Sequence, residues 1–196
     1  TRRVTRWNEA GRMTEVLADR FEGKRLNRPN DAIVRSDGSV WFSDPDFLFN
    51  QRRDEVKELS EQNVYRLDPR TKQLTAMARG VNKPNGLAFS PDERFLYVTD
   101  SGGFDILRFP VQADGALGAR AIFATLKVKG LDGLTFDAQG RLWCAALDGV
   151  HVFDGSGRDL GTIRLPAKPT SIAFAPPPSR WVAVSTRDAL YVATLR

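Results

Sequence analysis

The sequence NGLAFSPDERFLYVTD, residues 85–100, contains a pattern that recurs along the chain and predicts its architecture. A polar residue opens it, and two short apolar runs follow on either side of Pro91-Asp92-Glu93. Proline and aspartate are strong turn formers, and short runs rich in aliphatic and aromatic residues favour strands. The stretch therefore predicts a tight antiparallel hairpin.

Three more copies of this pattern occur along the chain. They are NDAIVRSDGSVWFSD from Asn30, DGLTFDAQGRLWCAA from Asp132 and TSIAFAPPPSRWVAVS from Thr170. The copies begin at intervals of roughly 40 to 55 residues, which is close to the length of one four-stranded propeller blade. A second hairpin with alternating apolar residues follows each of the first three copies, as expected of outer strands with one exposed face. We therefore predict an all-β fold of the β-propeller type.

The 196 residues are expected to form one propeller domain, 1–196. The blade at each end looks incomplete, which predicts about four and a half blades of a six-bladed domain whose N-terminal blade and a half are missing. A five-bladed ring that closes on itself is the alternative. One insertion, residues 45–62, follows the first hairpin and is expected to form either a lid or a solvated excursion. Its segment 51–62 predicts one short amphipathic helix.

Composition excludes several classes of protein. The chain is 41% hydrophobic and 27% charged, with a net charge of +5, but its basic residues are scattered and form no nucleic-acid footprint. No apolar run is long enough to cross a bilayer, so we expect a soluble protein with no membrane partner, either cytoplasmic or periplasmic. The single cysteine, Cys144, and the single histidine, His151, both lie in strand patterns. This argues against histidine-rich zinc sites and against Cys-His or Ser-His nucleophiles.

Oxygen-bearing side chains occupy equivalent positions of the repeats. In a propeller the inner strands line the central channel, so residues at one repeat position form a ring at its mouth. The first positions of the four copies are Asn30, Asn85, Asp132 and Thr170, and two of the hairpins end on Asp44 and Asp100. Carboxylate and amide oxygens are the ligands of a hard cation such as calcium or magnesium, with manganese or zinc as possible substitutes. A structural cation is the alternative to a catalytic one.

Three stretches carry a resemblance to a known family. RLNRPNDAIVRSDGSVWFSDP (25–45), KPNGLAFSPDERFLYVTDS (83–101) and GLDGLTFDAQGRLWCAA (130–146) resemble the SMP-30/gluconolactonase/LRE-like family. The resemblance implies a six-bladed propeller that hydrolyses a small sugar lactone with the help of a divalent cation, with calcium expected first.

Residue roles follow from the same resemblance. It implies that Asn85 and Asp132 are metal ligands, and that Asp132 is also the general base. Asp100, which lies nearby in the predicted mouth, is a second candidate for the proton acceptor. Asn30 and Arg28 are implied as substrate contacts, and Asp44 is expected to join them.

One expected ligand has no counterpart. The family's remaining metal ligand is a glutamate in an E-G-P context, and this sequence has no such motif. Glu9 and Glu22 stand in outer-strand and loop contexts instead. The chain therefore keeps two of the three expected protein ligands.

The sequence is also compatible with three other functions. One is a non-catalytic propeller that is stabilised by calcium and binds a carbohydrate or a protein partner, and another is an inactive fragment of the lactonase. A third is a propeller enzyme of the strictosidine-synthase-like or paraoxonase-like sort. The paraoxonase-type site needs a histidine dyad, which the lone His151 disfavours.

Overall fold

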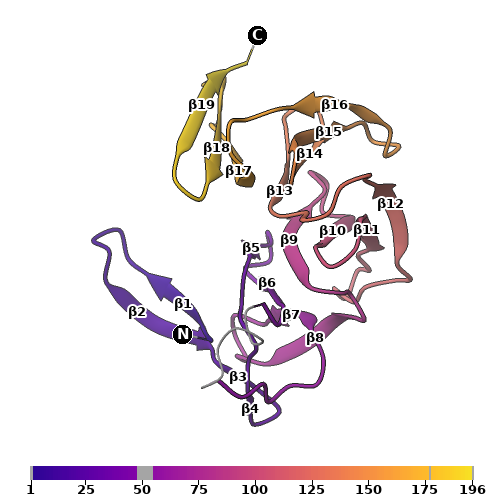
Figure 1. Cartoon of the computed structure of the whole chain (residues 1–196). Helices are drawn as coiled ribbons and strands as arrows, with labels where there is room; N and C mark the ends of the chain where they lie inside the picture. Colours follow the sequence, from indigo (N-terminus) through magenta and orange to yellow (C-terminus); the bar gives the residue numbers. More distant parts are fainter. Residues whose placement is uncertain (1, 48–54, 177, 196) are drawn as a thin grey trace. The chain divides into compact units, whose positions relative to one another are not determined.

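The computed structural model describes residues 2–47, 55–176 and 178–195. Every helix or strand among these residues is a β-strand, which confirms the all-β prediction. The chain divides into two compact units, Thr1–Pro84 and Asn85–Arg196, which are described in turn (Figure 1).

The first unit contains one four-stranded antiparallel sheet and two small hairpins. The large sheet has the order β5-β6-β7-β8, formed by Ala32–Val34, Val40–Asp44, Asn63–Leu67 and Leu74–Arg79. The hairpins are β1-β2, Val4–Trp7 with Met13–Ala18, and β3-β4, Arg20–Phe21 with Lys24–Arg25. Strands that follow one another in the chain are neighbours in the large sheet, which is the order of a propeller blade.

A small aromatic cluster forms the core of the first unit. Leu26, Phe42, Leu59 and Tyr65 are buried together. The ring centroids of Phe42 and Tyr65 lie 5.4 Å apart, and those of Phe21 and Tyr65 lie 4.9 Å apart. Because Phe42 lies on β6 and Tyr65 on β7, this cluster fixes the sheet against the segment that carries Leu26.

The second unit contains two four-stranded sheets and one three-stranded sheet. The first has the order β12-β11-β10-β9, with β9 Pro84–Phe89, β10 Phe95–Asp100, β11 Asp105–Pro110 and β12 Ala121–Thr125. The second has the order β13-β14-β15-β16, formed by Leu134–Phe136, Leu142–Ala146, Gly149–Phe153 and Asp159–Ile163. The third has the order β17-β18-β19, formed by Pro169–Phe174, Trp181–Thr186 and Leu190–Thr194.

Apolar side chains join these three sheets face to face. One cluster includes Ile106 from β11, Phe123 from β12 and Leu142 from β14. A second cluster packs Trp143 of β14 against β17 and β18, and its ring meets Phe174 edge-on at a centroid distance of 5.2 Å. Aligned packing of blade-like sheets through their apolar faces is the arrangement that the repeat predicted.

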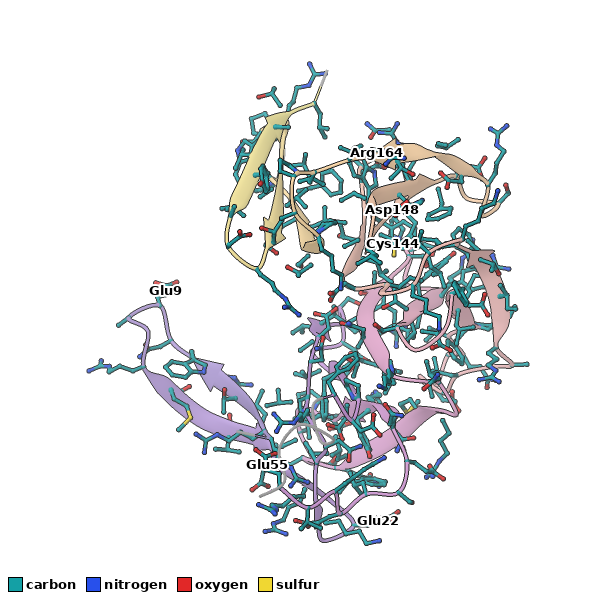
Figure 2. The ribbon with its side chains drawn as sticks, viewed as in Figure 1. Glu9, Glu22, Glu55, Cys144, Asp148 and Arg164 are labelled. Carbon is teal, nitrogen blue, oxygen red and sulfur yellow. The ribbon has the colours of Figure 1, made fainter. Side chains whose placement is uncertain are left out.

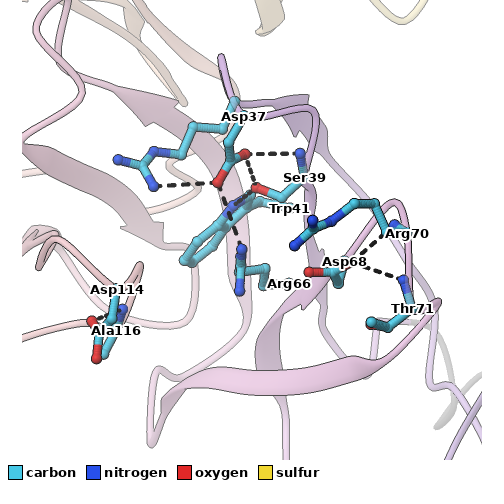
Figure 3. A network of polar contacts seen from close by, with 10 residues as sticks. Asp37, Ser39, Trp41, Arg66, Asp68, Arg70, Thr71, Asp114 and Ala116 are labelled. Atoms are coloured by element: carbon cyan, nitrogen blue, oxygen red, sulfur yellow. Dashed lines mark hydrogen bonds and ion pairs between the residues drawn. The ribbon is translucent and has the colours of Figure 1, made fainter.

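Aspartate residues close the tight turns of the inner hairpins. Figure 3 shows the first: the Asp37 carboxylate accepts a hydrogen bond from the Ser39 amide at 2.8 Å, and the Trp41 indole donates to the Ser39 hydroxyl at 2.9 Å. In the equivalent turn of the second unit, Asp137 accepts from the Trp143 indole at 2.9 Å. Burial alone would raise the pKa of Asp137, but hydrogen bonds from Arg141 and Trp143 lower it overall. These local bonds stabilise the turns at Asp37 and Asp137.

The predicted helix in the insertion is not found where the chain can be described. Residues 48–54 lie outside the described part, and residues 55–62 form no helix. Leu59 is buried as expected, whereas 69% of Val56 is exposed. The Leu59 side chain is therefore held by the aromatic cluster rather than by a helical turn. No helix among the described residues is long and apolar enough to span a membrane.

Candidate functional site

The segments that carry Asn85 and Asp132 are in direct backbone contact. A Cβ atom added at Gly86 would lie only 2.4 Å from the carbonyl oxygen of Asp132 and 2.8 Å from the Cα atom of Gly133. No side chain fits in that space, so glycine is needed at position 86 for the two segments to approach. The structure thus brings together the two residues that the sequence analysis expects to bind a metal.

Thr99 connects the same two segments through its hydroxyl group. The amide of Gly86 donates to Thr99 Oγ1 at 2.8 Å, and Thr99 Oγ1 donates to the carbonyl oxygen of Asp132 at 2.9 Å. Thr99 lies on β10 and is completely buried. A buried hydroxyl that both accepts and donates fixes the strand starts of two sheets relative to one another.

The third equivalent position in this unit continues the row. The Gly133 amide donates to the carbonyl oxygen of Thr170 at 2.9 Å, and a Cβ atom at Gly133 would lie 2.8 Å from that same oxygen. Asn85, Asp132 and Thr170 therefore stand on neighbouring backbone segments, as the repeat predicts. The Thr170 hydroxyl group forms a hydrogen bond with the Ser185 hydroxyl group, and the two oxygen atoms lie 3.0 Å apart.

The Asp132 carboxylate is half-buried and forms an ion pair. Lys168 donates to Asp132 Oδ2 at 2.9 Å, with side-chain exposures of 33% and 20%, respectively. Asn85 on β9 is buried, with 5% of its surface exposed. Asp100, the last residue of β10, accepts a hydrogen bond from the Gly103 amide at 2.9 Å and so closes the turn that follows its strand.

Two of the predicted substrate contacts lie at the start of the first hairpin in the other unit. The Asn30 amide donates to the carbonyl oxygen of Ser43 at 3.0 Å, and the residue is exposed. The Arg28 guanidinium donates to Glu55 Oε2 at 2.5 Å. Glu55 belongs to the predicted insertion, so an ion pair connects this insertion to the loop before β5.

Asp44 is completely buried beneath that loop. Its Oδ2 atom accepts a hydrogen bond from the Asn27 amide at 2.8 Å, and the Arg28 amide also donates to the carboxylate. Burial raises the pKa of Asp44 to about 7, against the opposing effect of these two amides. In this structure Asp44 supports the backbone that carries Arg28.

Two buried acceptors lie opposite each other next to this loop. Asp44 on β6 and Asn63 on β7 are directly paired across the two strands, so their side chains share one face of the sheet. Neither Asp44 Oδ1 nor Asn63 Oδ1 has a hydrogen-bond partner. The Asn63 amide nitrogen donates to the Tyr65 hydroxyl at 3.0 Å, which fixes the orientation of the Asn63 side chain.

The lone cysteine lies on β14, where Figure 2 labels it, and the lone histidine lies on β15. Cys144 is fully buried, and burial raises the pKa of its thiol. The His151 ring lies between two carboxylates, with Nε2 2.9 Å from Asp148 and Nδ1 3.1 Å from Asp159. Both residues are therefore held by packing or hydrogen bonding within the blade.

The two glutamates considered in place of the missing ligand lie at hairpin turns. Figure 2 shows Glu9 at the tip of the β1-β2 hairpin and Glu22 at the turn between β3 and β4. Among the described residues, no group of three or more His, Cys, Asp or Glu side chains is arranged to hold a metal ion. The predicted set is of a different type, since it combines one carboxylate with an amide oxygen.

The residues present nevertheless fit a hard divalent cation. The donors of Asn85 and Asp132 are oxygens only, on backbone segments fixed in contact by Gly86 and Thr99. A cationic group, the Lys168 ammonium, already lies against the Asp132 carboxylate in this structure. Sequence reasoning missed Lys168, Thr99 and Glu55, because nothing in the repeat pattern marks them.

The blade-like sheets define the class of this protein as a β-propeller, which the likeness to a solved structure confirms. The chain superposes on a gluconolactonase of Xanthomonas campestris with a TM-score of 0.91 and 38% sequence identity, covering 100% of this chain and 66% of that one. The profile of the SMP-30/Gluconolactonase/LRE-like region matches residues 1–188. The chain belongs to this family, as the sequence analysis predicted.

Two curated relatives are also similar over most of the chain. The gluconolactonase of Zymomonas mobilis subsp. mobilis is 33% identical over 174 residues, covering 83% of this chain and 49% of the relative. The 6-deoxy-6-sulfogluconolactonase of Pseudomonas putida is 34% identical over 170 residues, covering 84% and 55%. The chain thus spans about half the length of these relatives.

Proposed function

We propose that the protein hydrolyses a small sugar lactone to the free aldonic acid, with a divalent cation at Asn85 and Asp132. Membership of the family and the names of its relatives, both lactonases, support this reaction class. The observation that carries the site is the contact between the Asn85-Gly86 and Asp132-Gly133 segments. Their oxygen donors favour calcium, with zinc, magnesium or manganese as substitutes.

The reaction adds water across the ester bond of the ring. Water attacks the lactone carbonyl carbon, the bond from that carbon to the ring oxygen breaks, and the ring oxygen leaves as a hydroxyl group. A bound divalent cation supplies Lewis-acid polarisation of the carbonyl oxygen. Asp132, half-buried at the end of its loop, accepts the proton from the attacking water and passes it on to the leaving ring oxygen, and Asp100 is the second candidate for this role.

Substrate contacts are assigned to the loop before β5. Exposed Asn30 presents its side-chain amide, and Arg28, whose guanidinium is paired with Glu55 in this structure, carries further N–H donors suited to sugar hydroxyl groups. Asp44 contributes by holding the Asn27 and Arg28 amides, which sets the position of this loop. Its predicted direct contact with the sugar would require its carboxylate to leave a fully buried position.

The test measures the hydrolysis of glucono-1,5-lactone by pH-stat titration. The protein is first stripped of metal, and calcium, zinc or manganese is then restored. We expect turnover above the spontaneous rate only with metal, and loss of that turnover in Asp132→Asn. Asp114→Asn is the matched control, because Asp114 is an exposed turn residue of the same unit. Metal binding without turnover contradicts the proposal and favours a non-catalytic calcium-stabilised propeller.

A further inference from the structure

Lys168 is the charged residue in direct contact with the proposed metal ligand Asp132. Its ammonium group donates to Asp132 Oδ2 at 2.9 Å, and both side chains are more than half-buried. An ion pair in such a partly shielded position is stronger than one on the open surface, because less water screens the two charges. The Lys168 ammonium group thus binds Asp132 Oδ2, one of the oxygen atoms that a cation would need.

The position of Lys168 is determined by the backbone around it. It directly precedes β17, and Thr170, two residues further on, accepts a hydrogen bond from Gly133 at 2.9 Å. The same Gly133 allows no side chain against the Thr170 carbonyl group. The segment that begins at Lys168 is therefore attached to the segment that carries Asp132.

Because Gly130 has no side chain, it leaves room for the Lys168 side chain. Its φ of +72° is in the left-handed region, and a Cβ atom there would touch Lys168 Nζ at 3.6 Å and Cε at 3.7 Å. The end of the Lys168 side chain therefore lies across the backbone of Gly130 on its way to Asp132. The position of the ion pair is therefore set by Gly130, by the segment attached at Thr170 and by the Asp132 carboxylate.

We propose that Lys168 is an internal competitor of the divalent cation at Asp132. In the metal-free protein its ammonium neutralises the carboxylate, and cation binding requires the ammonium to give up Oδ2 and to accept a divalent charge close by. Lys168 is thus a positioning residue that sets the affinity and ion preference of the site, rather than a group that touches the lactone. This inference rests on the proposed function only in taking Asp132 as a metal ligand.

Removal of the ammonium should therefore tighten cation binding. We expect Lys168→Met to lower the dissociation constant for calcium or manganese about three- to tenfold, because it removes one competing ion pair and one nearby positive charge. Lys168→Arg keeps the charge and should stay near the wild-type affinity. Lys129→Met is the matched control: Lys129 is exposed, lies in the same unit, and stacks over the Phe104 ring at 5.3 Å.

The measurement is calorimetric titration of the metal-stripped protein with calcium chloride and with manganese chloride, which needs no turnover. Asp132→Asn is titrated alongside. Weaker binding in Asp132→Asn together with tighter binding in Lys168→Met, but not in Lys129→Met, supports the inference. If Asp132→Asn binds weakly while Lys168→Met binds like the wild type or more weakly, the inference is wrong and the metal site stands. If Asp132→Asn binds as tightly as the wild type, both are wrong.

Discussion

Asp44 is a carboxylic acid in a position that solvent does not reach. Two backbone amides stabilise its charged form, but burial outweighs them and raises its pKa to about 7. Its Oδ1 atom and that of the cross-strand neighbour Asn63 are both buried acceptors without a donor. Burial of a carboxylate oxygen without a donor is costly for the charged form, so the folded state favours the neutral acid.

The pH dependence of stability follows from this shift. The folded protein retains the Asp44 proton up to about pH 7, whereas in the unfolded chain the group ionises near its ordinary pKa of 3.8. Between these values the folded state binds more protons, so this group's contribution to stability is full below about pH 4 and is lost as the pH rises towards 7. The slope is at most about 1.4 kcal/mol per pH unit.

Urea unfolding of the wild type and Asp44→Asn from pH 5 to pH 8 measures this contribution. We expect the difference in unfolding free energy between the two proteins to change with pH in that window, because the asparagine does not titrate. Asp114→Asn serves as the control, since Asp114 is exposed. A wild-type curve parallel to that of Asp44→Asn would contradict the assignment.

Gly86 is the residue on which the contact between the two ligand segments depends. A methyl group at this position would lie 2.4 Å from the Asp132 carbonyl oxygen, which belongs to backbone and cannot rotate away. We expect Gly86→Ala to destabilise the protein by about 3 kcal/mol, as overpacking of a tight contact does. Gly155→Ala, where nothing lies within 4 Å, should be close to neutral. Equal thermal midpoints for the two variants would show that the contact is not rigid.

At the scale of the elements, Thr99 joins β9 and β10 to the loop before β13. The Thr99 hydroxyl group accepts a hydrogen bond from the Gly86 amide and donates one to the Asp132 carbonyl oxygen. Its loss therefore leaves a buried amide and a partly buried carbonyl group without this partner. Such a group contributes to stability and also fixes the spacing of Asn85 and Asp132.

Thr99→Val keeps the shape of the side chain and removes its hydrogen bonds. We expect a loss of about 1–3 kcal/mol in unfolding free energy and weaker calcium binding in a calorimetric titration. Thr99→Ser should restore both. Thr125→Val is the control, because Thr125 is an exposed residue whose hydroxyl bonds only to Asp105. Calcium affinity unchanged in Thr99→Val would mean that Thr99 has no part in spacing the ligands.

The elements were predictable from the sequence to the extent that their determinants are local. The inner hairpins follow from turn residues and apolar runs, and the aspartate bonds at Asp37 and Asp137 are formed within six residues. The contacts of Lys168, Thr99 and Glu55 join positions far apart in the chain, and a single sequence does not record such distances. The burial of Asp44 was missed for the same reason, since it depends on the loop at Asn27 folding over it.

At the scale of the whole molecule, the proposed metal site should couple to stability. A ligand that binds only the folded state raises the unfolding free energy by about 2.7 kcal/mol at a hundred times its dissociation constant. For a chain of this size that corresponds to a rise of about 5 to 10 °C in the thermal midpoint. We expect this rise in calcium compared with chelator, and its absence in Asp132→Asn. A rise of the same size in Asp132→Asn would place the stabilising ion elsewhere.

The strand order of the sheets has a consequence for how the chain acquires its structure. In each of the three four-stranded sheets, every strand pairs with the strand before or after it in the chain. Contact order within a sheet is therefore low, and the hairpins with tight turns close on the microsecond scale of isolated hairpins, whereas β6 and β7 must close the longer insertion 45–62. Docking of one sheet on the next, through glycines such as Gly86 and Gly133, brings together segments much further apart. We therefore expect amide exchange to identify single blades as the cooperative units that open and close.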